Sequence, residues 1–167
     1  IEPILSSDPD RAIKIASNSK INNIKRFIAR RLTVDNKLYP VVQEIQKNKK
    51  DRNHLLLGIR DALEGYPEVT TPKNWSNTYQ TLRLNQSKSS DLALDISILF
   101  GDKLAAETLV AFLSDERSPT KDKVKAIKGL ATQKRVELSD KIPSLINDKN
   151  LRIESIRSVA YFDSDQL

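Results

Sequence analysis

The sequence lacks cysteine and methionine entirely, and it holds only one tryptophan, one histidine and four glycines among 167 residues. Without cysteine, the chain cannot supply disulfides, thiol nucleophiles, cysteine zinc sites or a C-x-x-C-H haem attachment of its own. Four glycines are too few for a turn-rich all-β fold, and long segments poor in glycine and in β-branched residues favour helix. These absences favour an all-α fold.

No apolar run approaches the roughly 18 residues that a membrane-spanning helix needs. Hydrophobic residues make up 38% and charged residues 30% of the chain, a composition typical of folded, polar-surfaced proteins. The length suits one domain or a short repeat array. Because the chain begins at Ile1 and ends in SVAYFDSDQL, we expect it to be a piece of a longer polypeptide.

Positive charge is concentrated in the first third of the chain. Residues 1–60 hold 13 Lys and Arg against 6 Asp and Glu, a net +7, whereas residues 61–167 hold 15 against 16, a net −1. This asymmetry is compatible with a solvated basic face. It is also compatible with a surface for an acidic protein, nucleic acid or anionic lipid.

Residues 20–32 are amphipathic, with Ile21, Ile24, Phe27 and Ile28 at the three-and-four spacing of one helical face. Arg26 and Arg30 fall on the opposite side. Arg31 falls on the apolar face, where an arginine needs a carboxylate, a route out to solvent or a ligand. Shorter helices are expected after Asp8-Pro9 and around residues 38–45.

Residues 51–75 are predicted to be the structural centre of the chain. A helix over 51–64, capped by Asp51 and ended by Gly65, is apolar on nearly all sides, which is typical of a helix with neighbours on both flanks. Gly58 in its middle costs roughly 1 kcal/mol of helix stability relative to alanine. Close approach of another backbone would explain why glycine and not alanine occupies this position. A further helix is expected to begin after Asn74, and Trp75 and Tyr79, one turn apart in it, are predicted to be core residues.

From residue 91 onwards the helical pattern repeats, and helices are expected over 92–102, 104–115, 122–131, 140–148 and 151–163. The apolar positions of the first helix recur in the third at an offset of 31 residues, and those of the third recur in the fifth at 29. The set in the first is Ala93, Ile96, Leu99 and Phe100, in the third Val124, Ile127, Leu130 and Ala131, and in the fifth Ile153, Ile156, Val159 and Ala160.

Helix pairs that recur about every 30 residues are typical of an α-solenoid. The sequence therefore predicts an all-α fold of about four to five HEAT-like repeats in a right-handed superhelix. We expect residues 1–167 to form a single such domain, with irregular, basic repeats over 1–88 and regular repeats over 89–167.

Four segments together resemble one group of HEAT-like proteins: RFIARRL at 26–32, HLLLGIRDALEG at 54–65, the proline-bearing loop to Trp75, and LALDISILFGD at 92–102. They are similar to the HEAT-like region of large proteins of planctomycetes, verrucomicrobia and Bacteroidetes described as membrane-bound dehydrogenases or haem-binding cytochrome c proteins. In that family a β-propeller precedes the repeats and a cytochrome c domain follows them. The resemblance implies an extracytoplasmic (periplasmic or cell-envelope) linker or scaffold. This chain has no C-x-x-C-H, so any haem would lie outside it.

No arrangement of residues in the sequence predicts catalysis. His54 has no carboxylate pair at metal-ligand spacing, and Asp61 and Glu64 form an ordinary surface pair. No G-x-S-x-G motif, phosphate loop or dinucleotide fingerprint occurs. We therefore expect no enzyme activity, no cofactor and no metal site within this chain.

Two functions remain. In the first, the chain is a non-catalytic scaffold that binds a protein or the flanking domains of its own polypeptide. In the second, the basic N-terminal third binds nucleic acid, with further cations at Lys47, Lys49 and Lys50. The candidate partner-binding residues are Lys25, Arg26, Arg30, Arg60, Tyr66 and Lys73.

Overall fold

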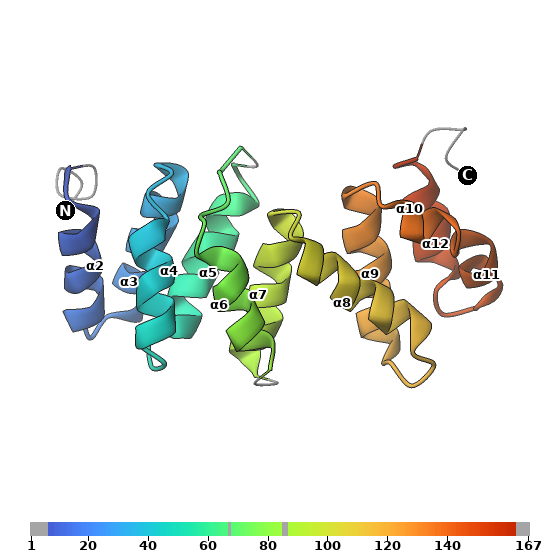
Figure 1. Cartoon of the computed structure of the whole chain (residues 1–167), viewed down its shortest axis with the longest axis horizontal. Helices are drawn as coiled ribbons and strands as arrows, with labels where there is room; N and C mark the ends of the chain where they lie inside the picture. The colour runs from blue at the N-terminus through green and yellow to red at the C-terminus, as the bar shows by residue number, and fades with distance from the viewer. Residues whose placement is uncertain (1–6, 67, 85–86, 163–167) are drawn as a thin grey trace. The chain divides into compact units, whose positions relative to one another are not determined.

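The fold is described from a computed structural model, which describes residues 7–66, 68–84 and 87–162. These residues form eleven helices and no strand, so the all-α prediction is confirmed (Figure 1). The bounds are α2 Pro9–Asn18, α3 Asn22–Val34, α4 Tyr39–Lys47, α5 Arg52–Leu63, α6 Trp75–Arg83, α7 Lys88–Leu99, α8 Lys103–Ser114, α9 Thr120–Thr132, α10 Val136–Ser139, α11 Ile142–Asn147 and α12 Arg152–Val159. The predicted helices are present with their ends displaced by a few residues, and only α10 was not predicted.

The chain divides into two compact units, Ile1–Phe100 and Gly101–Leu167. The division lies just after α7, at Gly101. The φ of Gly101 is +68°, a left-handed conformation that glycine adopts more readily than other residues. Asp102 then starts α8, because its carboxylate accepts hydrogen bonds from the backbone N–H groups of Leu104 (2.9 Å) and Ala105 (3.2 Å). The predicted change from irregular to regular repeats lay earlier, between residues 88 and 89. Whether the two units act as a single domain stays a prediction.

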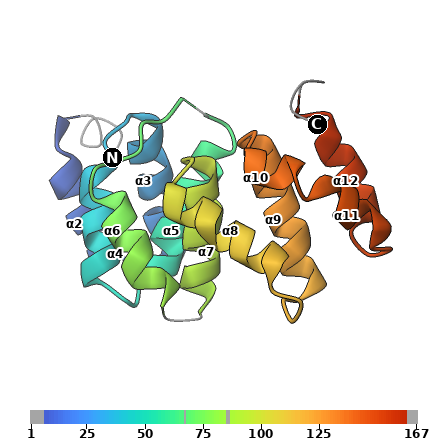
Figure 2. The ribbon, with the colours of Figure 1, turned by 45° about the vertical axis from the view of Figure 1, so that its right-hand side comes forward.

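The first unit has two layers of helices. Contacts link α2, α4 and α6 in one layer and α3, α5 and α7 in the other. Figures 1 and 2 show α4 and α6 in front, with α3 and α5 behind them. The central helix is α5, which packs against α3, α4 and α7, as the apolar character of residues 51–64 predicts. Trp75 and Tyr79 are buried as predicted, and the Trp75 indole N–H donates to the Ser97 hydroxyl at 2.9 Å.

Gly58 is the point of closest approach between α5 and α3. A Cβ built on Gly58 would lie 2.3 Å from the carbonyl oxygen of Arg26 and 2.8 Å from the Cβ of Ala29. Real Cβ atoms essentially never come so close to other atoms, so only glycine permits this crossing. The predicted close backbone approach is therefore confirmed.

The predicted buried face of α3 is wrong by about one residue of helical rotation. Ile21 and Phe27 are exposed, and the buried face comprises Lys25, Ile28, Ala29, Leu32 and Thr33. Two contacts explain the rotation. The Gly58 crossing seats Ala29 against α5, and the buried Lys25 ammonium donates to the Asp51 carboxylate. Arg31 is consequently exposed and pairs with Asp35 at 3.3 Å, so it does not enter the core.

In the second unit, α9 packs mainly against α8, α10 and α12, and α12 packs mainly against α9 and α11. Ile127 and Leu130 of α9 are fully buried. The repeat predicts the same for Ile156 and Val159 of α12, but Ile156 is exposed and Val159 is only half-buried, so here the prediction is wrong. Ile153 and Ile156 are exposed, because α12 turns a different face towards α9 and α11. Within the described residues, no helix combines the length and apolar character needed to cross a membrane.

Candidate functional site

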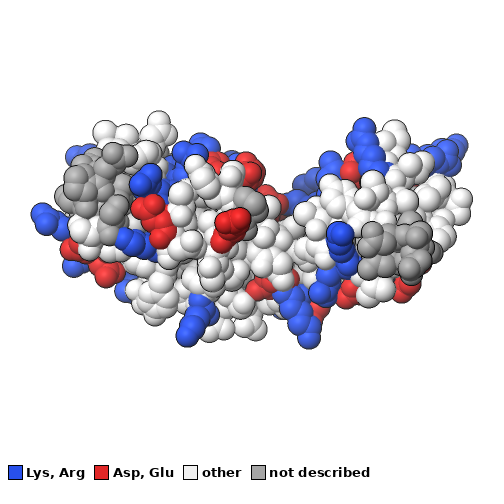
Figure 3. Space-filling view, turned by 90° about the horizontal axis from the view of Figure 1, so that it is seen from above, with Lys and Arg blue, Asp and Glu red and all other residues white. Residues whose placement is uncertain are grey.

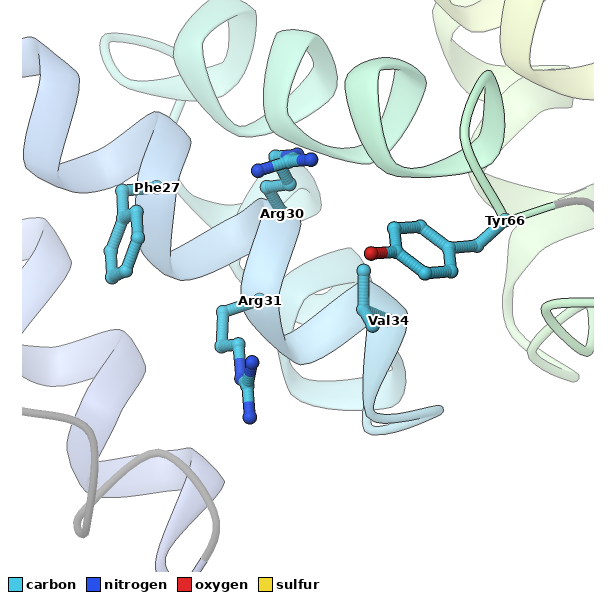
Figure 4. A pocket seen from close by; sticks show the side chains of 5 residues that line it. All are labelled: Phe27, Arg30, Arg31, Val34 and Tyr66. Atoms are coloured by element: carbon cyan, nitrogen blue, oxygen red, sulfur yellow. The ribbon is translucent and has the colours of Figure 1, made fainter.

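A small hollow in the first unit is lined by Phe27, Arg30, Arg31 and Val34 of α3 and by Tyr66, which follows α5. We call it the α3 pocket. Figure 4 shows Tyr66 reaching towards Val34 with its hydroxyl facing α3, while Arg30 and Arg31 leave the helix in different directions. Phe27 is 47% exposed and Tyr66 49% exposed, so both aromatic rings are available to a partner.

The α3 pocket exists because the turn after α3 and the segment after α5 are tied together. In the turn that follows α3, Asn36 has a φ of +55°, and the N–H groups of Asn36 and Lys37 donate to the carbonyls of Thr33 and Leu32. The Asn36 side-chain oxygen then accepts from the Thr70 N–H at 2.8 Å. At the other end of the loop, the Asn74 side chain donates to the Tyr39 carbonyl at 3.3 Å. The Tyr66 N–H donates to the Ala62 carbonyl at 2.8 Å, which holds the base of the tyrosine.

Positive charge in the α3 pocket is only partly neutralised. Arg31 pairs with Asp35, whereas Arg30 has no ion-pair or hydrogen-bond partner in the part of the chain that the structure describes. The Tyr66 hydroxyl likewise has no partner there. A guanidinium carries five donors in a planar fork that matches a carboxylate. The pocket can therefore take an anionic group that contacts Arg30 and Tyr66.

The neighbouring cations on α3 and α5 are paired with Asp61 of α5 and with Glu64, which directly follows α5. Arg26 donates through Nε to the Asp61 carboxylate, and this hydrogen bond, then the charge of Asp61, raises the pKa of Arg26 above its ordinary value. Arg60 lies 3.9 Å from Asp61 and 3.5 Å from Glu64. Because their charges are compensated within the fold, Arg26 and Arg60 contribute less to binding an anion than Arg30 does.

The structure places the six predicted partner-binding residues in different environments. Arg30 and Tyr66 both line the α3 pocket, and Arg26 and Arg60 belong to the adjacent ion-pair cluster. Lys73 is exposed and does not line the pocket. The prediction that Lys25 contacts a partner is corrected by the structure. Lys25 is 4% exposed and is paired with Asp51, so a partner cannot reach it in this fold.

The sequence does not predict Phe27 and Val34 as pocket residues, and it leaves contact of Arg31 with a ligand as one of three alternatives. Phe27 was assigned to the core because it shares the spacing of Ile21 and Ile24. The only sequence feature that points the other way is the glycine at position 58, which requires a small residue such as Ala29 opposite it. If the buried face of α3 is taken to be the face that carries Ala29, Phe27 falls on the exposed side.

The α3 pocket has a volume of about 100 Å³. Pockets for cofactors and drug-sized ligands usually span roughly 300–1,000 Å³, so this hollow has room for a single side chain or a small anion. The described ranges contain no group of three or more His, Cys, Asp or Glu side chains arranged to hold a metal ion.

On the face of the first unit shown in Figure 3, Lys and Arg side chains lie in separate groups, with Asp and Glu side chains and uncharged surface between them. A duplex or a single strand of nucleic acid is usually bound by a continuous stripe of Lys and Arg, which follows the phosphate backbone.

Comparisons with protein-family models, with curated proteins and with solved structures find no match for this chain. The resemblance to the HEAT-like region of haem-binding bacterial proteins therefore stays a prediction.

Proposed function

We propose that this chain is a non-catalytic scaffold that binds a protein segment, either a separate partner or a flanking domain of its own polypeptide, through the α3 pocket. One observation carries the proposal. Arg30 and Tyr66, with Phe27 beside them, form a small exposed hollow in which the guanidinium lacks a counter-charge. Aromatic residues and arginine are the residue types most enriched at the energetic centres of protein interfaces.

The proposed partner segment presents a carboxylate to Arg30 and an apolar group to Phe27. The pocket volume of about 100 Å³ limits the inserted group to a single side chain. A stable complex buries roughly 1,200–2,000 Å² in total, so the remaining contacts would lie around the pocket. HEAT-like stacking of the helix pairs and an extracytoplasmic location are parts of this proposal, supported by the 29- to 31-residue repeat and by the family resemblance.

Nucleic-acid binding through residues 1–60 is the alternative, and the ion pairs weaken it. Of the 13 Lys and Arg residues of this segment, Lys25, Arg26 and Arg31 each pair with an acidic side chain. Arg52 donates to the carbonyl of Ile45 at 2.9 Å, and burial lowers its pKa below the ordinary value. Fewer cations are thus available for phosphates than the composition indicates.

Site-specific photo-cross-linking tests the proposal in cells that produce the protein in its natural context. A photoreactive amino acid replaces Phe27 or Tyr66, and Leu84, which is 75% exposed and outside the pocket, serves as the matched control position. We expect a discrete protein cross-link, between chains or within one chain, from positions 27 and 66 and none from 84. Arg30→Glu should abolish it, and Arg83→Glu, which reverses an exposed arginine outside the pocket, should not.

Equal cross-links from all three positions, or none at 27 and 66, would contradict the proposal. A cross-linked species that nuclease removes and protease does not would favour the nucleic-acid alternative. In that case, binding would also weaken steeply as salt is raised.

A further inference from the structure

The outward face of α12 carries two exposed isoleucines, whereas the buried residues within the helix are the two serines Ser155 and Ser158. The inward residues are spaced i, i+4, i+7 and i+11 along one side of the helix: Leu151, Ser155, Ser158 and Phe162. Ile153, Ile156 and Ala160 lie on the opposite side, at about 100° per residue. Ile153 is 66% exposed and Ile156 54% exposed. We call these three residues the α12 strip.

The orientation of α12 is well determined by its contacts. The buried hydroxyl of Ser155 donates to the Leu151 carbonyl at 3.0 Å, and that of Ser158 donates to the Ser155 carbonyl at 2.7 Å, so neither serine is left unsatisfied. Glu154 lies 3.6 Å from Lys128 of α9, and the Arg152 Nε donates to the Ile146 carbonyl at 2.9 Å. The two serine bonds lie within α12 itself, whereas rotating α12 to bury the isoleucines would break its contacts with Lys128 and Ile146.

Two of the three residues of α9 that correspond to the α12 strip by the 29-residue repeat are covered by other helices, and the third, Val124, which corresponds to Ile153, is half-buried. Ile127, which corresponds to Ile156, is fully buried, and so is Ala131, which corresponds to Ala160, at 1% exposed. α9 is buried on two sides, because it packs against α8 as well as α12. By the repeat, α12 therefore carries apolar side chains at positions that are typical of a helix packed on two sides. Within the described residues, no helix covers these side chains.

Arginines stand on both sides of the α12 strip. Arg157, with its side chain 70% exposed, lies along one edge, and Arg152 lies along the other. Glu154, the acidic residue on this helix, is already shared between Lys128 and Arg157, each at 3.6 Å. Acidic residues that flank the apolar stripe of a docking helix would be complementary in charge to these arginines.

We propose that the α12 strip is a docking surface for an amphipathic helix of a protein partner, whose apolar stripe is flanked by acidic side chains. The mode is that of helix recognition through anchors at i, i+3, i+4 and i+7. An anionic membrane is the less favoured occupant. Two isoleucines and an alanine on an eight-residue helix form a narrow strip, whereas interfacial helices carry a broad apolar face. This docking surface is independent of the α3 pocket.

The test uses synthetic helical peptides as probes and the backbone amide resonances of the isotope-labelled chain as the readout. Each peptide has about 15 residues, the length at which isolated helices begin to be stable in water. One carries leucines at i, i+3, i+4 and i+7 flanked by glutamates. A second has lysines in place of the glutamates, and a third has the composition of the first in an order that lines no face. The variants are Ile153→Glu with Ile156→Glu, and Leu84→Glu as the control.

We expect the acidic amphipathic peptide to shift the amides of residues 151–162 saturably, with a Kd in roughly the tens of micromolar because the interface is small. The lysine peptide should bind about tenfold more weakly. The double variant should lose the shifts, and Leu84→Glu should keep them. Because Ile153, Ile156 and Leu84 are exposed, circular dichroism should show all variants folded.

Four results would overturn the proposal. These are no saturable shift at about 1 mM peptide, equal shifts with the reordered peptide, shifts that survive the double variant, and shifts centred away from α12. Shifts of the same amides that depend on protein concentration in the absence of peptide would show that the α12 strip binds a second copy of this chain and not a partner helix. Binding to vesicles of phosphatidylcholine and phosphatidylserine that the double variant abolishes would show that it binds a membrane instead.

Discussion

Gly58 sets how closely α5 and α3 can approach, and through that contact it sets which face of α3 is buried. The Cβ of an alanine at this position would overlap the Arg26 carbonyl oxygen and would also meet the Arg30 N at 2.9 Å. Backbone atoms cannot move aside as a flexible side chain can, so the two helices would have to separate. The exposure of Phe27 and the existence of the α3 pocket both depend on this crossing.

We predict that Gly58→Ala destabilises the protein by about 1–3 kcal/mol, the usual cost of overpacking, even though alanine is the better helix former. Gly65→Ala is the matched control, because its Cβ would have no neighbour nearer than 3.8 Å. That substitution should change the free energy of unfolding by less than about 0.5 kcal/mol. Urea denaturation measures both. Equal effects of the two substitutions would show that helix propensity, and not the close approach, dominates at Gly58.

The Lys25–Asp51 pair is the second residue-scale determinant of α3, since both side chains are 5% exposed. Lys25→Met leaves the Asp51 carboxylate buried with only the Asn48 amide, at 3.0 Å, as a described side-chain donor. We predict a loss of about 3–5 kcal/mol, the usual cost of breaking a buried pair by removing one partner. The double change Lys25→Met with Asp51→Leu should recover part of that loss. If it is instead less stable than the single variant, the carboxylate has a further structural role.

At the scale of the element, the helix ends show which local sequence signals are sufficient to locate the start of a helix. Asp8 caps α2 by accepting from the Arg11 N–H at 2.9 Å, as the Asp-Pro start predicts. Asp51 precedes α5 as expected, yet its carboxylate makes no capping bond, because Lys25 and Asn48 occupy it. A cap signal therefore locates the start of a helix even where the side chain is used elsewhere.

We predict that Asp102→Ala lowers the free energy of unfolding of the second unit by about 0.5–2 kcal/mol, since it removes the two capping hydrogen bonds at the start of α8. Asp140→Ala is the control, because that carboxylate is exposed and makes no capping contact. Thermal unfolding followed by circular dichroism gives both values. An effect of Asp140→Ala as large as that of Asp102→Ala would point to net charge as the cause.

At the scale of the whole molecule, each of the two units has its own buried core, so we expect two unfolding transitions. Trp75 is the single tryptophan and is buried in the first unit, so its fluorescence reports that unit alone. Circular dichroism reports both units. Gly58→Ala should shift the fluorescence transition, whereas Asp102→Ala should shift only the part of the dichroism that fluorescence does not follow. Coincident transitions that move together in both variants would contradict independent units.

The sequence by itself determined the all-α class, the position of nearly every helix, the burial of Trp75 and Tyr79, and the close approach at Gly58. These follow from local spacing, caps and steric limits, which operate over a few residues. Only the tertiary structure decided the rotation of α3 and α12 about their axes. A helix with apolar residues on more than one side can bury either face. The choice was made by partners distant in sequence, namely Asp51 and Gly58 for α3, and Lys128 and Ile146 for α12. The α3 pocket and the α12 strip are the faces that those choices left exposed.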